Sequence, residues 1–146
     1  MKIAVGCDHG GYVLLQAVSD HLRAQGHEVS TYGSLDGQRV EYPEVAFEVA
    51  ERVVHGEADL GILMCGTGIG MSIAANKVKG IRCAHVTESY SARMAHRHNN
   101  ANIIALGGRT LGDQLALEII DAFLDETFEG GRHHERLSMI ADYEER

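Results

Sequence analysis

Short apolar runs alternate with helical patterns along the chain, and this alternation restricts the fold more than any other feature of the sequence. Five runs have the length and composition of strands that are buried on both faces of a sheet. They cover residues 2–7, 28–32, 60–64, 82–86 and 102–106. Because strands and helices alternate without a repeat of fixed period, the sequence predicts βαβ units and an α/β fold with a parallel sheet.

The segments between the apolar runs carry helical spacing and helix boundary signals. The segment 12–26 places its apolar residues three and four positions apart and ends at a glycine. A second helix is predicted to begin at Pro43 and to end at Gly56. Thr87 and Thr110 are predicted to cap two later helices. A C-terminal helix is expected after "EGGRH", with its apolar positions at Leu137, Ile140 and Tyr143.

Together these elements predict a three-layer αβα sandwich in a single domain over residues 1–146. With right-handed crossovers, the simplest arrangement is a five-stranded parallel sheet in the Rossmann-like or flavodoxin-like order 2-1-3-4-5. Ligands of open α/β sheets bind at the carboxyl ends of the strands where the strand order reverses, here between strands 1 and 3. Asp8 and His9 follow strand 1, and Cys65 follows strand 3. We therefore expect these polar residues to converge on a ligand site.

Composition restricts the partners and the compartment. The formal net charge of −8 disfavours a broad contact with nucleic acid or a membrane surface, so we expect a small-molecule ligand and neither of those partners. The cysteines Cys7, Cys65 and Cys83 are odd in number and form no C-x-x-C pair, which is typical of free thiols in a reducing compartment. No run approaches a membrane span, and the first run is too short for a secretory signal. We predict a cytoplasmic protein and interpret Cys7 and Cys83 as packing residues.

The stretch "CGTGIG", residues 65–70, follows the third apolar run directly and leads into a helical pattern. Gly66, Gly68 and Gly70 allow backbone N–H groups to approach an anion closely at the start of a helix. In such a field the thiol of Cys65 ionises more readily, which suits a nucleophile, a metal ligand or a base. The alternative is a small buried cysteine that only packs, and the position alone leaves both interpretations open.

Known motifs that contain a similar loop do not fit this one. A dinucleotide fingerprint that begins at Gly66 requires a glycine where Met71 stands, and a P-loop requires a Gly-Lys-Ser/Thr run that is absent. A low-molecular-weight tyrosine phosphatase has arginine at the position of Met71, and a response regulator has aspartate at the position of Cys65. The nine histidines show no metal-ligand spacing, and His96 and His98 face different directions on a helix. We therefore expect no metal and no nucleotide cofactor.

Six segments form a distinctive pattern that extends over nearly the whole chain. They are "CDHGG" (7–11), "GILMCGTGIGMSIAANK" (61–77), "GIR" (80–82), "YSARMAHRHNNAN" (90–102), "GGR" (107–109) and "GGRHHER" (130–136). Together and in this order they resemble the sugar-phosphate isomerases that comprise ribose-5-phosphate isomerase type B and the galactose-6-phosphate isomerase subunits. The resemblance implies a flavodoxin-like sandwich, a homodimer or dimer of dimers with shared active sites, and metal-free aldose–ketose interconversion.

The resemblance also implies roles for individual residues. Cys65 matches the base that moves a proton between C1 and C2 through a cis-enediol, while Thr67 and the loop glycines would bind the enediolate oxygens. His98 matches the residue of ring opening, and Asp8 would orient sugar hydroxyls near that step. Asn99 matches a contact near the reacting end of the sugar. The phosphate-binding positions are matched by His9, Arg109, Arg132 and Arg136.

Each of these assignments has a purely structural alternative. The polar pair after strand 1 is also suited to cap the next helix, and His98 at a helix end complements the helix dipole. Asn99 is equally suited to a turn. Arg132 and Arg136, four positions apart on one helix face, either straddle a phosphate or pair with neighbours such as Glu129 in solvent. Only the family context favours the functional interpretation.

We predict an isomerase that interconverts D-ribose 5-phosphate and D-ribulose 5-phosphate, a step of the pentose phosphate pathway. The alternatives are an isomerase of a six-carbon sugar phosphate, such as allose 6-phosphate or galactose 6-phosphate, and a non-catalytic phosphosugar-binding module. A thiol redox sensor built on Cys65 is disfavoured because no resolving cysteine is evident. The chain departs from the common family pattern at His96 and Asn100, where arginine and aspartate are frequent.

Overall fold

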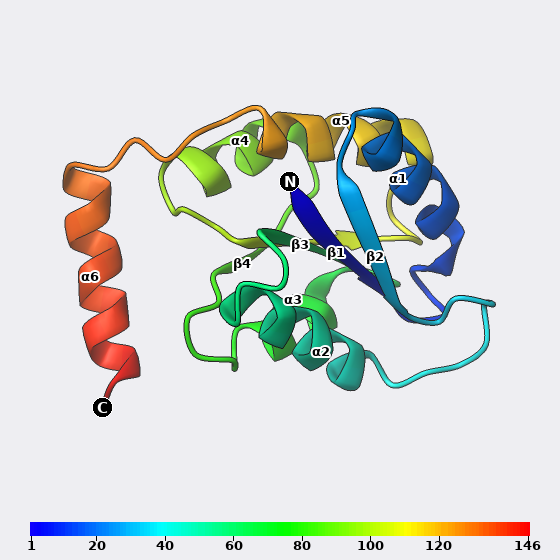
Figure 1. Cartoon of the computed structure of the whole chain (residues 1–146), viewed down its shortest axis with the longest axis horizontal. Helices are drawn as coiled ribbons and strands as arrows, with labels where there is room; N and C mark the ends of the chain where they lie inside the picture. The colour runs from blue at the N-terminus through cyan, green and yellow to red at the C-terminus, as the bar shows by residue number, and fades with distance from the viewer.

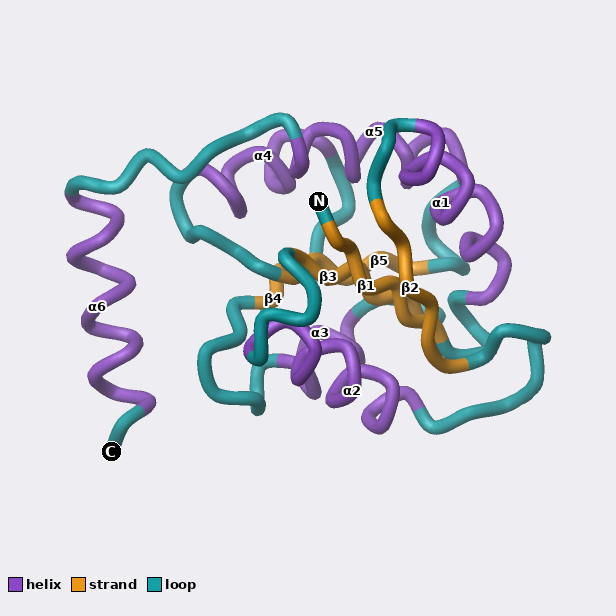
Figure 2. Tube along the Cα trace, in the orientation of Figure 1, coloured by secondary structure: helices purple, strands orange, loops and turns teal.

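All five predicted strands form one parallel sheet in the computed structural model, which describes residues 1–146 (Figures 1 and 2). The strands are β1 (Lys2–Cys7), β2 (Glu28–Gly33), β3 (Leu60–Cys65), β4 (Cys83–His85) and β5 (Ile103–Gly107). β3 and β5 are buried at every position because they lie inside the sheet and helices cover both of its faces.

The helices cover the sheet in two layers, which confirms the predicted αβα sandwich (Figure 2). One layer holds α1 (Tyr12–Ala24), α4 (Ser89–Arg97) and α5 (Asp113–Leu124). The other layer holds α2 (Tyr42–Val54) and α3 (Ile69–Ala75). Each layer packs on its own apolar cluster, one beneath α1, α4 and α5 and one beneath α2 and α3. No helix is long and apolar enough to cross a membrane.

The strand order is β2-β1-β3-β5-β4, so the predicted order 2-1-3-4-5 is wrong for the last two strands. The reversal between β1 and β3 lies where it was predicted. The reason for the exchange is the handedness of the crossovers. α4 lies in the same layer as α1, and a right-handed crossover through that layer moves in the direction from β1 to β2. β5 therefore returns toward the middle of the sheet and lies between β3 and β4.

The two predicted threonine caps are also wrong. The carboxylate of Glu88 caps α4 by accepting a hydrogen bond from Ser91 N at 2.9 Å. Thr110 donates its hydroxyl to the Gly107 carbonyl oxygen at 3.3 Å instead of capping a helix, and α5 begins after Gly112. The Glu88 carboxylate reaches the first-turn amide of α4 as well as a threonine hydroxyl would, so the cap moves by one residue.

The predicted C-terminal helix is present as α6 (Arg132–Glu144), but it stands apart from the sandwich (Figure 1). Leu137 is half-buried, whereas Met139, Ile140 and Tyr143 are 71%, 56% and 70% exposed. An amphipathic helix whose apolar side chains remain exposed is incompletely packed within the single chain.

Candidate active site

Three loops meet at the carboxyl ends of β1, β3 and β5, and glycines allow them to touch. A Cβ atom at Gly10 would lie 2.8 Å from Gly66 N, and one at Gly108 would lie 2.4 Å from Gly10 O. Asp8 N donates a hydrogen bond to Met64 O at 3.1 Å, which ties the loop after β1 to the end of β3. The structure thus brings together the segments that the sequence placed at the switch point.

Cys65 is the last residue of β3, and its side chain points into the loop that follows. The residue is 5% exposed, and Gly68 N–H donates a hydrogen bond to its Sγ at 3.1 Å. This hydrogen bond holds the sulfur in a fixed position at the start of the loop. Gly68 has a φ of +84°, and a Cβ atom there would lie 2.9 Å from the Leu106 carbonyl carbon. Only glycine allows the backbone to direct this amide at the sulfur.

The rest of this loop presents unused hydrogen-bond donors. The backbone N–H groups of Gly66, Thr67, Gly70 and Met71 make no hydrogen bond within the chain. Four free amides beside a thiol make the loop suited to hold an anionic oxygen next to a group that accepts and returns protons.

The other two cysteines have the character of packing residues. Cys7 and Cys83 are buried, and burial raises the pKa of each thiol to about 12. Cys7 donates its thiol proton to the Ser34 carbonyl oxygen at 3.2 Å. Both thiols stay protonated at neutral pH, so Cys65 is the cysteine whose surroundings suit acid–base chemistry.

Asp8 is buried and stabilises the turn before α1. Its Oδ1 accepts hydrogen bonds from Gly10 N at 2.8 Å and from Gly11 N at 3.0 Å. Oδ1 therefore has the structural role of capping the turn before the helix, whereas Oδ2 accepts no hydrogen bond from the chain. The neighbouring His9 is exposed at the same edge of the sheet.

Arg109 and Thr67 lie on the exposed side of the same loop cluster. Arg109 N donates to Gly66 O at 2.9 Å, and the guanidinium lies close enough that a Cβ atom at Gly66 would be 3.1 Å from its Nη1. Thr67 Oγ1 accepts a hydrogen bond from Ile69 N at 3.2 Å. A permanent cation next to free amides reinforces the attraction of this loop for an anion.

Two side chains at this loop were not predicted from the sequence. The ring of Tyr42 covers Gly70, where a Cβ atom would lie 2.8 Å from the ring carbons. His85 Nε2 donates to the Thr67 carbonyl oxygen at 2.8 Å. A signal was available for both, because Tyr42 ends the long loop after β2 and His85 ends β4, and both places lie at the carboxyl edge of the sheet.

The structure does not bring His98 to Cys65 within one chain. Helices of the sandwich run antiparallel to the strands, so the C-terminal end of α4, which His98 caps, lies at the amino edge of the sheet. Arg82, directly before β4, confirms this location because its Nε donates to the carbonyl oxygen of Asn99 at 3.2 Å. The predicted phosphate ligands Arg132 and Arg136 lie beyond the same edge, on the exposed first turns of α6.

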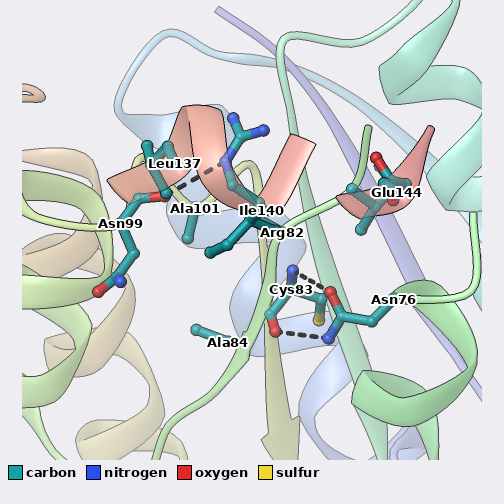
Figure 3. A pocket seen from close by; sticks show the side chains of 10 residues that line it. Asn76, Arg82, Cys83, Ala84, Asn99, Ala101, Leu137, Ile140 and Glu144 are labelled. Atoms are coloured by element: carbon teal, nitrogen blue, oxygen red, sulfur yellow. Dashed lines mark hydrogen bonds between the residues drawn. The ribbon is translucent and has the colours of Figure 1, made fainter. Parts of the chain in front are cut away.

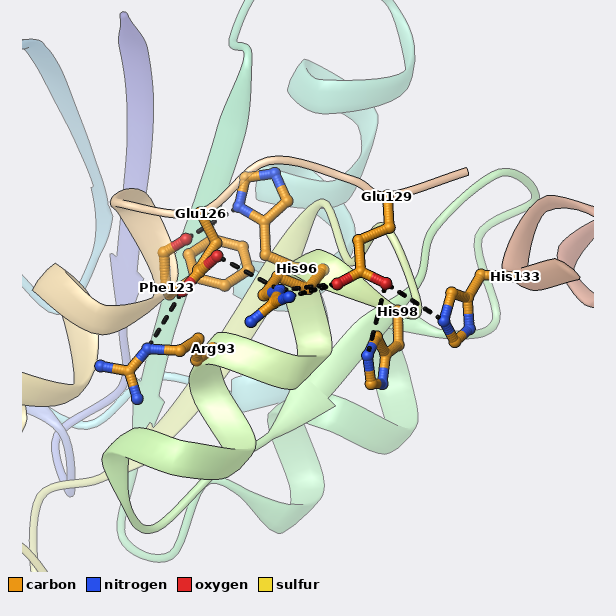
Figure 4. A network of polar contacts seen from close by, with 8 residues as sticks. Arg93, His96, His98, Phe123, Glu126, Glu129 and His133 are labelled. Atoms are coloured by element: carbon orange, nitrogen blue, oxygen red, sulfur yellow. Dashed lines mark hydrogen bonds and ion pairs between the residues drawn. The ribbon is translucent and has the colours of Figure 1, made fainter. Parts of the chain in front are cut away.

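His98 belongs to a compact polar cluster with Glu129 and His133 (Figure 4). The two imidazole rings are stacked, with centroids 4.2 Å apart and planes inclined by 10°. Glu129 Oε2 lies 3.8 Å from His98 Nε2 and 3.5 Å from His133 Nε2. Hydrogen bonds from Arg97 lower the pKa of Glu129, and burial lowers the pKa of His133. These three residues are the candidates for holding a metal, but each imidazole lone pair lies in its own ring plane, and two stacked planes 4.2 Å apart do not direct both lone pairs at one ion.

A cavity lies at this amino edge, away from Cys65. It has a volume of about 410 Å³ and separates α6 from the edge strand β4 (Figure 3). Asn76 bonds both backbone polar atoms of Cys83 in its wall, at 2.8 Å each. Leu137 and Ile140 of α6 form its apolar side. The cavity is thus the gap that the loosely attached C-terminal helix leaves.

The fold and the loop cluster define an open α/β protein with a thiol inside a loop of free backbone amides at the switch point. The chain belongs to the Ribose/Galactose Isomerase family, whose sequence model matches residues 3–140. This membership confirms the resemblance found in the sequence motifs.

Individual relatives extend over the full chain. Ribose-5-phosphate isomerase B of Escherichia coli is 47% identical, and the match covers 99% of this chain and 97% of the relative. The structure of Clostridium thermocellum ribose-5-phosphate isomerase B superimposes with a TM-score of 0.97 at 51% identity and covers 99% of this chain and 98% of that one. A galactose-6-phosphate isomerase subunit of Clostridium acetobutylicum is 43% identical over 94% of this chain and 79% of its own length.

Proposed function

We propose that this protein is a ribose-5-phosphate isomerase, a single catalytic domain that interconverts D-ribose 5-phosphate and D-ribulose 5-phosphate. The observation that carries the proposal is the Cys65 thiol, which accepts the Gly68 hydrogen bond inside a loop of free amides. Relatives of this name are similar over nearly their whole length. A binding module would need the anion loop but would have no use for a thiol that an amide holds in place.

In the proposed reaction the Cys65 thiolate is the base. It takes the proton from C2 of the open-chain aldose, the electron pair forms the C1–C2 double bond, and O1 becomes negatively charged. The proton on O2 then passes to O1 as the C2 carbonyl forms, and C1 takes back a proton from the Cys65 thiol, which gives the ketose and restores the thiolate. The amides of Gly66, Thr67 and Gly70 stabilise the charged oxygens of the enediolate, and the Thr67 hydroxyl lies beside them.

The cyclic sugar must open before this proton transfer. The C1–O4 bond breaks, O4 takes a proton, and O1 loses one as the aldehyde forms. We assign this exchange to the imidazole of His98, because imidazole both donates and accepts protons near neutral pH. Asn99 next to it is proposed to contact the reacting end, and Asp8 is proposed to orient a sugar hydroxyl through its Oδ2.

This assignment requires two copies of the chain. Cys65 lies at the carboxyl edge of the sheet and His98 at the amino edge, so a site with both groups takes His98 from a second copy. A homodimer or dimer of dimers with shared sites satisfies this requirement, since two-fold symmetry creates two equivalent sites. The exposed Met139, Ile140 and Tyr143 of α6 offer apolar surface for such an interface.

The phosphate of the substrate is proposed to lie between positive groups of both copies. His9 and Arg109 stand at the carboxyl edge of one chain, and Arg132 and Arg136 come from α6 of the other. Guanidinium groups four positions apart on one helix face can bind phosphate oxygens together, and arginine keeps its charge at every physiological pH. No step of this scheme uses a metal or cofactor, and the three free thiols support a cytoplasmic location.

A substrate panel tests the proposed function. Initial rates of isomerisation of ribose 5-phosphate, allose 6-phosphate and galactose 6-phosphate are compared at equal concentration. We expect kcat/KM for ribose 5-phosphate to exceed the other two at least about tenfold, since one extra carbon in a fitted pocket changes affinity by about 1–3 kcal/mol. A six-carbon preference would reject the substrate. Calorimetric binding of all three without turnover would instead reject the enzyme and support a binding module.

A further inference from the structure

The stacked pair of His98 and His133 has features that packing alone does not explain (Figure 4). His133 is 6% exposed, and its Nε2 is buried without a hydrogen-bond partner. A buried polar atom without a partner is destabilising, so its retention needs a reason. The ring of His98 lies against one face of His133, and the carboxylate of Glu129 lies 3.5 Å from the unpartnered nitrogen.

Glu129 is held so that its charge faces both rings. It lies on the linker between α5 and α6, and its backbone N–H donates to the Arg97 carbonyl oxygen at 3.0 Å. The side chain of Arg97 also contacts Glu129, since its Nε donates a hydrogen bond to Glu129 Oε1 at 2.9 Å. The other carboxylate oxygen, Oε2, is left to face His98 and His133 at 3.8 and 3.5 Å. Oε1 thus anchors the side chain to Arg97, and Oε2 faces the two imidazole rings.

Burial and the surrounding charges favour a neutral His133. Arg97 faces the cluster from α4, and Arg132 and Arg136 face it from α6; Glu129 is the anion of the cluster, with a lowered pKa that Arg97 causes. Burial lowers the pKa of His133, and the nearby charge of His98 lowers it further. Two imidazolium rings 4.2 Å apart would repel each other. His133 is therefore the neutral ring of the pair.

We propose that Glu129 and His133 are positioning residues that hold the His98 imidazole in the orientation needed to open the sugar ring. The proposal rests on the assignment of ring opening to His98 under the proposed function. His133 fixes the plane of the His98 ring by stacking, and the Glu129 carboxylate fixes the direction in which its Nε2 points. Neither residue touches the sugar in this account.

Three variants separate these two roles. Glu129→Gln keeps the size of the side chain and removes its charge. His133→Ala removes the stacking surface, and His133→Phe restores a flat ring without the buried nitrogen. Glu126→Gln is the matched control, because Glu126 also pairs with Arg97, at 3.5 Å, but faces neither imidazole in an ion pair. Circular dichroism and the oligomeric state are recorded for every variant.

We expect Glu129→Gln and His133→Ala to lower kcat/KM for ribose 5-phosphate at least about tenfold, His133→Phe to recover most of this loss, and Glu126→Gln to stay within about twofold of wild type.

The isotope effect identifies the step that slows. With ribose 5-phosphate deuterated at C2, Glu129→Gln is expected to show a smaller primary effect on kcat/KM than wild type, since ring opening then limits the rate. Turnover within about twofold of wild type, or an isotope effect that is unchanged or larger, would overturn the positioning role and leave the proposed function intact. A wild-type protein without any turnover of ribose 5-phosphate would overturn the proposed function itself, and the positioning role with it.

Discussion

Two inactive variants are predicted to restore activity when their chains are mixed. Cys65→Ala removes the proposed base at the carboxyl edge of the sheet, and His98→Asn removes the proposed ring-opening group at the amino edge. Each homodimer is then defective at both sites. In a mixed dimer one site receives both substitutions, and the other receives an intact Cys65 from one chain and an intact His98 from the other.

The size of the recovery follows from symmetry. Random pairing of equal amounts gives about half mixed dimers, and half of the sites in those dimers are intact, so about one quarter of wild-type activity returns. A dimer of dimers gives the same fraction if each site is shared across one interface. The value does not depend on the residual rates of the variants as long as both are below a few per cent of wild type.

The assay uses chains with two different affinity tags. The variants are mixed, partly unfolded in urea, refolded together and assayed with ribose 5-phosphate, and sequential purification on both tags isolates the mixed dimers. These are expected to have about half of the wild-type activity per dimer. If the mixture stays as inactive as each variant alone although the doubly tagged dimer is recovered, the site lies within one chain and the proposed division of the site is wrong.

Two further predictions concern the Cys65 loop. At about pH 8, iodoacetamide is expected to modify Cys65 and to leave Cys7 and Cys83 unmodified. Burial raises the pKa of both of these thiols to about 12, and only a thiolate reacts. Peptide mass spectrometry measures the labelling of each cysteine, and equal labelling of Cys83 would contradict the prediction. Gly68→Ala is expected to lose at least about tenfold in activity and more than about 2 kcal/mol in the free energy of unfolding. Gly56 also has a positive φ but lies in open space, so Gly56→Ala is expected to lose about 1–2 kcal/mol and to keep its activity. Urea unfolding and initial rates check both, and equal effects of the two substitutions would refute the role of the Gly68 backbone.

Much of the fold could be predicted because it depends on local patterns. A short apolar run between turn signals identifies a buried strand, and the spacing of apolar residues identifies each helix, so the sheet, the layers and the reversal between β1 and β3 all follow. The positions of β4 and β5 could not be derived in this way. They depend on the layer in which α4 packs, and that is decided by its contacts with α5. One overlooked signal is the polar Arg82 and His85 within the short run 82–86, since strands buried in the middle of a parallel sheet are nearly continuous apolar runs.

The candidate site shows the same division between local and long-range information. The loop after Cys65 was predicted because its glycines and its place after a strand are visible in the sequence. The environment of His98 was not, because Glu129 and His133 reach it only through the path of the linker before α6. Glu129 was considered as a solvent partner of Arg132 or Arg136, yet it pairs with Arg97.

His96 and Asn100, the two residues that depart from the family pattern, both make contacts that stabilise the fold. The imidazole of His96 lies with Nδ1 2.8 Å from the Phe123 carbonyl oxygen, so it joins α4 to α5 and does not face the cluster. Asn100 adopts a φ of +44°, a left-handed conformation that asparagine tolerates better than most residues, and its carbonyl oxygen accepts a hydrogen bond from Arg82 at 2.9 Å. Both residues thus stabilise the amino edge where His98 lies.

The most direct test of the central claim is the rate of ribulose 5-phosphate formation from ribose 5-phosphate, measured with EDTA present for the wild-type protein and for Cys65→Ala. We expect a wild-type rate that EDTA leaves unchanged and a loss of at least about a hundredfold in the variant, with circular dichroism showing an intact fold. A variant that retains the wild-type rate would show that Cys65 is not the base and that the proposed mechanism is wrong.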